Sequence, residues 1–176
     1  MGQVTSPTPA VLILGAFSRH PQALDWAREK AAQAWSPIVL ESERFVFDQT
    51  PYYHASMGER LLKTFWAFET LIDQGDLPDL KILTNQWEQE YQQTHDGPEP
   101  RALNLDPGYI TLAKLVLATT KDRDHRIYLR RGIYAEGTLH YHQGAWRSRE
   151  WTYPDYQQAE YHEFFTRCRN YLRSQR

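Results

Sequence analysis

The sequence predicts an α+β fold in a single domain, with a ferredoxin-like βαββαβ core extended by a helix, a β-hairpin or meander and a C-terminal helix. Three observations predict this fold. Apolar runs of strand length alternate with segments whose apolar residues recur at helical spacing. Turn residues separate these segments. The chain has 176 residues, which is enough for one domain with a substantial core.

The first elements supply the predicted centre of the sheet. Residues 1–9 are expected to be a flexible lead-in, and the domain to span residues 10–176. Ala10–Phe17 is a continuous apolar run, which is typical of a strand buried on both faces. Apolar residues at helical spacing follow Pro21, and proline is common in the first turn of a helix.

Four further elements follow this β–α unit. Ile38–Leu40 predicts a second strand, continued by Phe45–Phe47 after a polar interruption. Leu61–Ile72 fits either a helix or a strand, and its many β-formers favour the strand. A helical stripe of apolar residues covers Leu77–Tyr91, and Ala102–Leu105 is predicted to be the next strand.

The remaining elements are predicted from turn chemistry and spacing. Asp106-Pro107-Gly108 predicts a tight turn, because proline fixes φ and glycine tolerates positive φ. Apolar residues then recur at i, i+3, i+4, i+7 and i+8, so Tyr109–Thr120 is predicted to be a helix. Arg126–Leu129 and Ile133–Tyr141 form a hairpin, and a last helix runs from Asp155 to about Arg173. The expected architecture is one antiparallel or mixed sheet with helices on one face.

Composition and charge exclude several classes of partner. The formal net charge is −2, so neither nucleic acid nor an anionic membrane surface is an expected partner. No apolar run approaches the length of a membrane span, and no secretory signal is expected. The one cysteine, Cys168, lies on the apolar side of the last predicted helix, which indicates a core residue and not a nucleophile. A reducing, cytoplasmic location is expected.

Established catalytic and nucleotide-binding motifs are missing. There is no P-loop, no GxGxxG after the first strand, no GxSxG and no HExxH. The sequence therefore leaves the reaction and any cofactor unknown, and it predicts no metal site. Glu136, His140 and His142 share one face of a predicted strand and could bind a metal or exchange protons. A solvated edge hairpin is the favoured explanation of the two histidines.

Polar residues nevertheless gather where a ligand could bind. Lys81, Asn85 and Glu88 recur at i, i+4 and i+7, so they form one stripe, which is either a binding surface or a solvated face. Basic side chains and hydroxyls at the ends of the predicted 109–120 helix could hold an anion or complement the helix dipole. The candidate general bases are Asp106 and Glu136. The candidate ligand-binding residues are Lys81, Asn85, Arg101, Asn104, Tyr109, Thr119, Thr120, Lys121 and Arg126.

Several motifs along the chain carry a family resemblance. They are Phe47-Asp48, Tyr52-Tyr53, Met57-Gly58, Phe68-Glu69, Lys81 with Thr84-Asn85 and Glu88, Asn104–Tyr109, Leu117–Lys121, His125–Tyr128, Gly132–Glu136 with Thr138-Leu139, and Trp151–Tyr156. From Val11 onward the chain resembles uncharacterised bacterial and archaeal proteins grouped as a domain of unknown function, whose members are often automatically labelled GTP-binding protein. The resemblance implies a cytoplasmic single-domain protein. Its pattern points to the following residues: Asp48, Lys81, Asn85, Arg101, Asp106, Lys121, Arg126, Glu136 and Asp155.

Two functional hypotheses follow from the sequence. The first is a site for a small anionic molecule, phosphorylated or nucleotide-like, formed by the candidate residues. The second is a non-catalytic interaction or scaffold module, in which the aromatic clusters Tyr52-Tyr53 and Trp151–Tyr156 form a partner surface or a homodimer face. Within the second cluster, Thr152 or Asp155 is predicted to cap the last helix.

Overall fold

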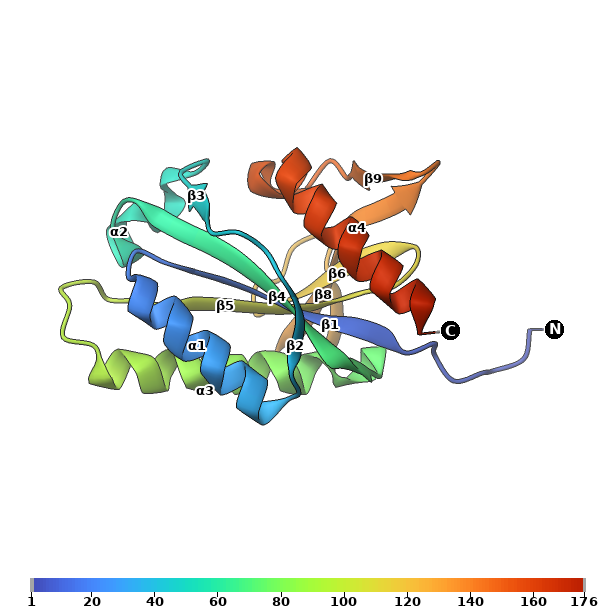
Figure 1. Ribbon diagram of the computed structural model, residues 1–176, viewed down its shortest axis with the longest axis horizontal. Helices are drawn as coiled ribbons and strands as arrows, with labels where there is room; N and C mark the ends of the chain where they lie inside the picture. Colours follow the sequence, from blue (N-terminus) through green and yellow to red (C-terminus); the bar gives the residue numbers. More distant parts are fainter. Residues whose placement is uncertain (1, 176) are drawn as a thin grey trace.

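The protein folds around one antiparallel sheet of nine strands, with helices on both faces (Figure 1). This architecture comes from a computed structural model, which describes residues 2–175. The strands are β1 Ala10–Ser18, β2 Ile38–Glu41, β3 Phe45–Phe47, β4 Leu61–Ile72, β5 Asn104–Ile110, β6 Lys114–Thr119, β7 Ile127–Arg130, β8 Ile133–His142 and β9 Ala145–Ser148. The helices are α1 Pro21–Ala34, α2 His54–Met57, α3 Leu77–Thr94 and α4 Ala159–Ser174, with short 3-10 turns η1 Pro51–Tyr53, η2 Gln74–Asp76 and η3 Pro154–Gln157.

The strand order is β2-β4-β1-β5-β6-β8-β7, with β3 beside β4 and β9 beside β8. All neighbouring strands are antiparallel. The α+β prediction is therefore confirmed at the level of a mixed fold with one antiparallel sheet.

The central strand β1 is buried on both faces, as its continuous apolar sequence predicted. Leu12 and Leu14 pack into the cluster that also contains buried residues of α1 and α3. Val11 and Ile13 pack into a second cluster with α4. The prediction of helices on one face is wrong, because β1 presents an apolar side chain to each face in turn and each face needs a cover (Figure 1).

Helix α4 packs on the face of the sheet opposite α1 and α3, through a stripe of apolar residues at helical spacing. Its buried residues are Tyr161, Phe164, Phe165, Cys168 and Leu172. Cys168 is fully buried, as predicted, and burial raises the pKa of its thiol. The helix begins later than predicted because η3 occupies Pro154–Gln157.

The prediction that Leu61–Ile72 is a strand is confirmed by β4. Its side chains alternate between the two covers, since Phe65 lies in the α4 cluster and Trp66 lies in the α1 and α3 cluster. The predicted hairpin of β7 and β8 is also confirmed. Arg131 and Gly132 have φ values of 55° and 77°, the two successive positive φ angles that a tight hairpin turn requires.

The helix predicted for Tyr109–Thr120 is wrong. The segment instead contains the end of β5, a turn and the strand β6. The predicted Asp106-Pro107-Gly108 turn is also wrong, because all three residues lie inside β5 and pair with β1. Gly108 is required there for a different reason. A Cβ atom on Gly108 would lie 2.5 Å from the Val116 carbonyl oxygen, so glycine allows β6 to approach β5.

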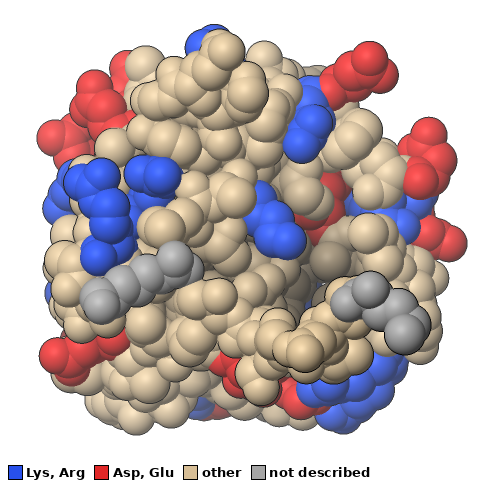
Figure 2. Space-filling model, turned by 90° about the vertical axis from the view of Figure 1, so that its right-hand side faces the viewer, with Lys and Arg blue, Asp and Glu red and all other residues tan. Residues whose placement is uncertain are grey.

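Within residues 2–175, no helix combines the length and the apolar composition needed to cross a membrane. The beginning of β1 and the end of α4 lie on the same side of the molecule (Figure 1). On that face, Lys and Arg side chains lie among Asp and Glu, with wide uncharged areas between them (Figure 2).

Replacing Gly108 by alanine tests the close approach of β6. We expect Gly108→Ala to lower the free energy of unfolding by roughly 1–3 kcal/mol, because the neighbouring atom belongs to the backbone and cannot rotate away. Urea denaturation measures this. Gly137→Ala is the matched control, since Gly137 is also a strand residue and its added Cβ meets nothing within 4 Å. Equal effects of the two substitutions would contradict this account.

Candidate functional site

A cavity opens where β5 and β6 diverge. The two strands pair only from Gly108 to Ile110, opposite Leu117 to Leu115. The preceding part of β5, from Asn104 to Pro107, pairs with β1 alone. The space beyond this split is a cavity of about 420 Å³, within the size range typical of small-molecule sites.

Helix α3 satisfies the β5 backbone at the split. The Lys81 ammonium donates to the Leu105 carbonyl oxygen at 2.6 Å, and the Leu105 N–H donates to the Glu88 carboxylate at 2.7 Å. Leu105 is fully buried, so both backbone groups would otherwise lack a partner. Asn85 lies between these two residues on the helix and also lines the cavity. The polar stripe noted in the sequence therefore faces the sheet and not open solvent.

Asp106 is the centre of a polar cluster on the cavity floor. Its carboxylate accepts a hydrogen bond from Asn104 at 2.7 Å and lies 3.2 Å from the Lys81 ammonium. Arg101 donates to the Asn104 side-chain oxygen and to Glu88. Burial raises the pKa of Asp106, but the charges of the nearby lysines and these hydrogen bonds outweigh burial and hold the pKa below its ordinary value.

The opposite wall contains a buried ion pair that the sequence analysis did not predict. Lys63 of β4 donates to Asp155 at 2.6 Å, and only 3% and 5% of their side chains are exposed. Aromatic rings surround the ammonium, with the ring centroids of Tyr156 and Phe47 at 4.2 and 4.9 Å. The clue in the sequence was a lysine inside the apolar run Leu61–Phe68.

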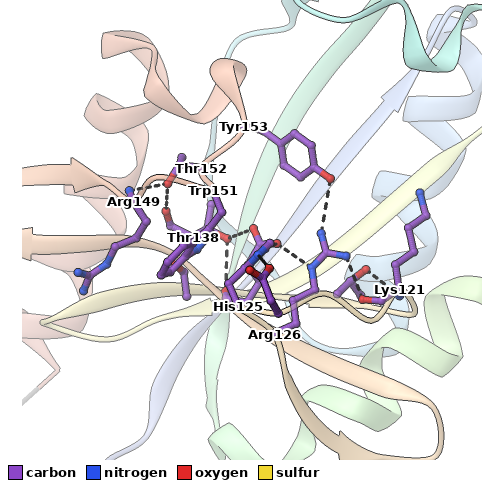
Figure 3. Close-up of polar contacts among 12 residues, drawn as sticks. Lys121, His125, Arg126, Thr138, Arg149, Trp151, Thr152 and Tyr153 are labelled. Atoms are coloured by element: carbon purple, nitrogen blue, oxygen red, sulfur yellow. Dashed lines mark hydrogen bonds and ion pairs between the residues drawn. The ribbon is translucent and has the colours of Figure 1, made fainter.

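The third side of the cavity is a network around Glu136 of β8. Its carboxylate accepts one hydrogen bond from Arg126 Nε, at 2.9 Å, and lies 3.1 Å from the His125 Nε2 atom. Arg126 also donates to the Lys121 carbonyl oxygen, and its other end points toward Tyr153 (Figure 3). The His125 ring stacks on the Trp151 ring, with ring centroids 5.0 Å apart. These contacts fix the loop between β6 and β7 against β8.

Thr152 fixes the segment that carries Tyr153. Its hydroxyl donates to the Thr138 carbonyl oxygen at 2.6 Å and accepts from the Arg149 N–H at 2.7 Å (Figure 3). The prediction that Thr152 or Asp155 caps the last helix is wrong. Thr152 ties its loop to β8, Asp155 pairs with Lys63, and α4 has no side-chain cap at its N-terminus.

The mouth of the cavity lies at the end of β6. Lys121 donates to the exposed Tyr52 hydroxyl at 2.8 Å. This hydrogen bond, together with the charge of Lys121, lowers the pKa of Tyr52. Arg123, Thr119 and Thr120 line the same edge. The Thr119 hydroxyl accepts a hydrogen bond from the Lys121 N–H.

The structure brings together ten of the eleven residues singled out as candidates. The residues that line the cavity are Lys81, Asn85, Arg101, Asn104, Asp106, Thr119, Thr120, Lys121, Arg126 and Glu136. Tyr109 does not line it, because it packs with Leu77 and Val116 under α3. Sequence reasoning missed Lys63 as a lining residue, and also the apolar wall formed by Phe17 and Phe47.

Comparison with known proteins gives a family but no characterised relative. A family model described as "Domain of unknown function (DUF4416)" matches residues 8–171. The chain belongs to this family. The match confirms the resemblance inferred from the sequence motifs. Neither the curated proteins nor the solved structures gave a match.

Removing one partner of the Lys63–Asp155 ion pair tests whether the pair is buried. We expect Asp155→Asn to lower the free energy of unfolding by about 3–5 kcal/mol, because Lys63 is left charged and buried. The double variant Lys63→Met/Asp155→Asn should regain most of this loss. Asp25→Asn, which breaks the exposed pair with Arg44, should cost under about 1 kcal/mol in the same denaturation experiment. A small effect of Asp155→Asn would contradict the assignment.

Asp106 gives a prediction for acid stability. Its pKa is lower in the folded than in the unfolded protein, so its contribution is present above the unfolded pKa and disappears as pH falls through the folded value. Asp106→Asn should lower stability at neutral pH by about 1–3 kcal/mol and make the loss of stability at acid pH shallower. Denaturant melts across pH measure both effects. Asp122→Asn removes an exposed carboxylate and should leave the profile unchanged.

Proposed function

We propose that the cavity between β5 and β6 binds a small anionic ligand, phosphorylated or nucleotide-like. The supporting observation is its charge balance. Six basic side chains and four acidic side chains line it, a formal excess of two positive charges, whereas the whole chain carries −2. The basic residues are Lys63, Lys81, Arg101, Lys121, Arg123 and Arg126, and the acidic residues are Glu88, Asp106, Glu136 and Asp155.

The excess charge lies at one place, the mouth. Each acidic side chain of the lining pairs with one basic side chain of the lining. Lys121 and Arg123 are the remaining two, and neither forms an ion pair with another described residue. The hydroxyls of Thr119 and Thr120 lie beside them. Two cations next to two hydroxyls suit a phosphate or carboxylate group.

The inner wall suits an apolar ring on the same ligand. Phe17 packs edge-on against Phe47 and Tyr53, with ring centroids 4.9 and 4.8 Å apart. All three side chains line the cavity. A ligand with a flat ring and an anionic group would place the ring against this wall and the charge at the mouth. This combination is the reason that we favour nucleotide-like over purely inorganic anions.

Of the two predicted general bases, Asp106 has a pKa held below its ordinary value, whereas a general base needs a pKa near the working pH. Asp106 and Glu136 hold Lys81 and Arg126 in position through hydrogen bonds, and Glu88 accepts a hydrogen bond from Arg101 in the same way. Glu88 is the better candidate for proton exchange, because burial raises its pKa and the charges of Lys81 and Arg101 offset only part of that rise. If the protein has an activity, we infer that it uses Glu88.

The alternative function, an interaction or scaffold module, relies on exposed aromatic residues. Tyr52 and Tyr153 are 65% and 51% exposed, which would suit a partner surface. Both also line the cavity, so they lie around its mouth and not on a separate flat patch. This placement is the observation that favours the ligand site over a partner surface or a homodimer face.

We also propose that the ferredoxin-like prediction describes the first half of the chain. The order β2-β4-β1-β5, all antiparallel, and the two helices α1 and α3 packed on one face support it. In this proposal, β6 to β9 and α4 are an extension, and the cavity lies at the junction of core and extension.

A ligand screen with matched variants tests the proposed function. Thermal-shift and calorimetric titrations with nucleotides, sugar phosphates and inorganic phosphate should identify a ligand. Lys121→Ala and Arg123→Ala should each weaken its binding about tenfold or more, the effect expected from losing one hydrogen bond to a charged group. Lys114→Ala removes an exposed cation from the other end of β6 and should leave affinity unchanged. Equal losses in all three variants would indicate nonspecific attraction and would contradict the proposed site.

A further inference from the structure

We propose that His20, His95 and Glu99 bind a divalent transition-metal ion of the zinc class. The Nε2 atoms of His20 and His95 lie 3.2 and 3.4 Å from the same Glu99 carboxylate oxygen, Oε2. One ligand atom from each residue lies within 4.8 Å of the others. Within residues 2–175, this is the one group of at least three His, Cys, Asp or Glu residues whose ligand atoms converge in this way.

The spacing allows the three groups to share a metal ion in place of the hydrogen bonds that the two imidazoles make with Glu99. Zinc–nitrogen and zinc–oxygen bonds are about 2.0–2.2 Å long, so two ligand atoms of a tetrahedral site lie about 3.3 Å apart. The separations of 3.2 and 3.4 Å agree with this value. The two imidazole rings also lie close together, with centroids 4.5 Å apart and ring planes inclined by 57°. Two imidazoles and a carboxylate are a ligand set that zinc and its neighbours prefer to calcium or magnesium.

The ligands come from two distant parts of the chain that are held together by packing, His20 from one and His95 with Glu99 from the other. His20 directly precedes α1, and His95 directly follows α3. The two helices contact each other through Trp26 and Tyr91, whose ring centroids are 5.1 Å apart. Glu99 comes from the loop after α3. A ligand set fixed by two packed helices needs little rearrangement when the ion enters.

The carboxylate is already oriented for binding. Arg19 donates to the other oxygen of Glu99, Oε1, at 2.7 Å, which leaves Oε2 directed at the two histidines. A hydrogen-bonded partner behind a metal ligand is the usual way to fix its orientation. Exposure of His20, at 27% of its side chain, leaves a path for the ion and room for water as a fourth ligand.

The site is separate from the cavity and from the histidine pair that the sequence singled out. None of the three ligands lines the cavity. The prediction that Glu136, His140 and His142 share one face is wrong, because a bulge in β8 after Gly137 places Glu136 on the opposite face of the sheet, where it pairs with Arg126 and His125. The ring centroids of His140 and His142 are 6.4 Å apart. The second pair therefore lacks a converging carboxylate and supplies a control.

Titration of tag-free protein with Co²⁺ and Zn²⁺ tests the proposal. We expect one equivalent of Co²⁺ to give the visible absorption bands of a tetrahedral site, and Zn²⁺ to displace it. His95→Ala and Glu99→Gln should each weaken Zn²⁺ binding by more than about 100-fold, since loss of a partner behind a ligand already costs about 10- to 100-fold. His142→Ala, which removes an exposed imidazole elsewhere, should leave the affinity unchanged.

Circular dichroism of the metal-free variants shows whether each one folds. For any variant that does not fold, imidazole ¹H–¹⁵N spectra of the wild-type protein replace it, and zinc should shift the Nε2 signals of His20 and His95 alone. Two results would overturn the proposal. One is no binding of either ion by the wild-type protein at millimolar concentration. The other is binding that persists in His95→Ala and Glu99→Gln, or zinc-induced shifts confined to other histidines.

Discussion

The point at which β6 stops pairing with β5 determines the cavity. Three paired positions, beginning at Gly108, hold the strands together, and glycine is required because the Val116 carbonyl approaches so closely. Beyond this point the β5 backbone has no strand on that side. A helix supplies the missing partners, because Lys81 and Glu88 bond to the two backbone groups of Leu105. Charged side chains therefore lie in the interior because the unpaired backbone of β5 needs hydrogen-bond partners there.

Those charges then constrain one another. Lys81 forms an ion pair with Asp106, and Glu88 forms one with Arg101. On the far wall, Lys63 forms an ion pair with Asp155. An ion buried without a partner is costly, so each interior charge fixes the position of a second. The result is a polar lining in which only Lys121 and Arg123, at the mouth, have no carboxylate partner among the described residues. The same logic applies at the other end of α3, where Glu99 is held between Arg19 and two histidines.

The error over Tyr109–Thr120 shows how a wrong local assignment can leave a site prediction intact. A helix of twelve residues would separate its ends by about 18 Å. The antiparallel hairpin instead brings the beginning of β5 toward the end of β6, so Asn104 and Asp106 line the same cavity as Thr119 and Lys121. Tyr109 was lost from the set for the same reason, since strand alternation turns it toward α3. Apolar spacing over a short segment could not separate a helix from two strands and a turn.

Features that depend on neighbouring residues along the chain could be predicted without coordinates. These are the doubly buried strand β1, the stripes of α3 and α4, the tight turn at Arg131-Gly132 and the family to which the chain belongs. Three features became visible only in the folded protein: the register of β5 against β6, the partner of Lys63, and the contact of His20 with Glu99, which are 79 positions apart. Strand register and ion pairing depend on contacts between distant segments. Local periodicity and turn chemistry contain no information about those contacts.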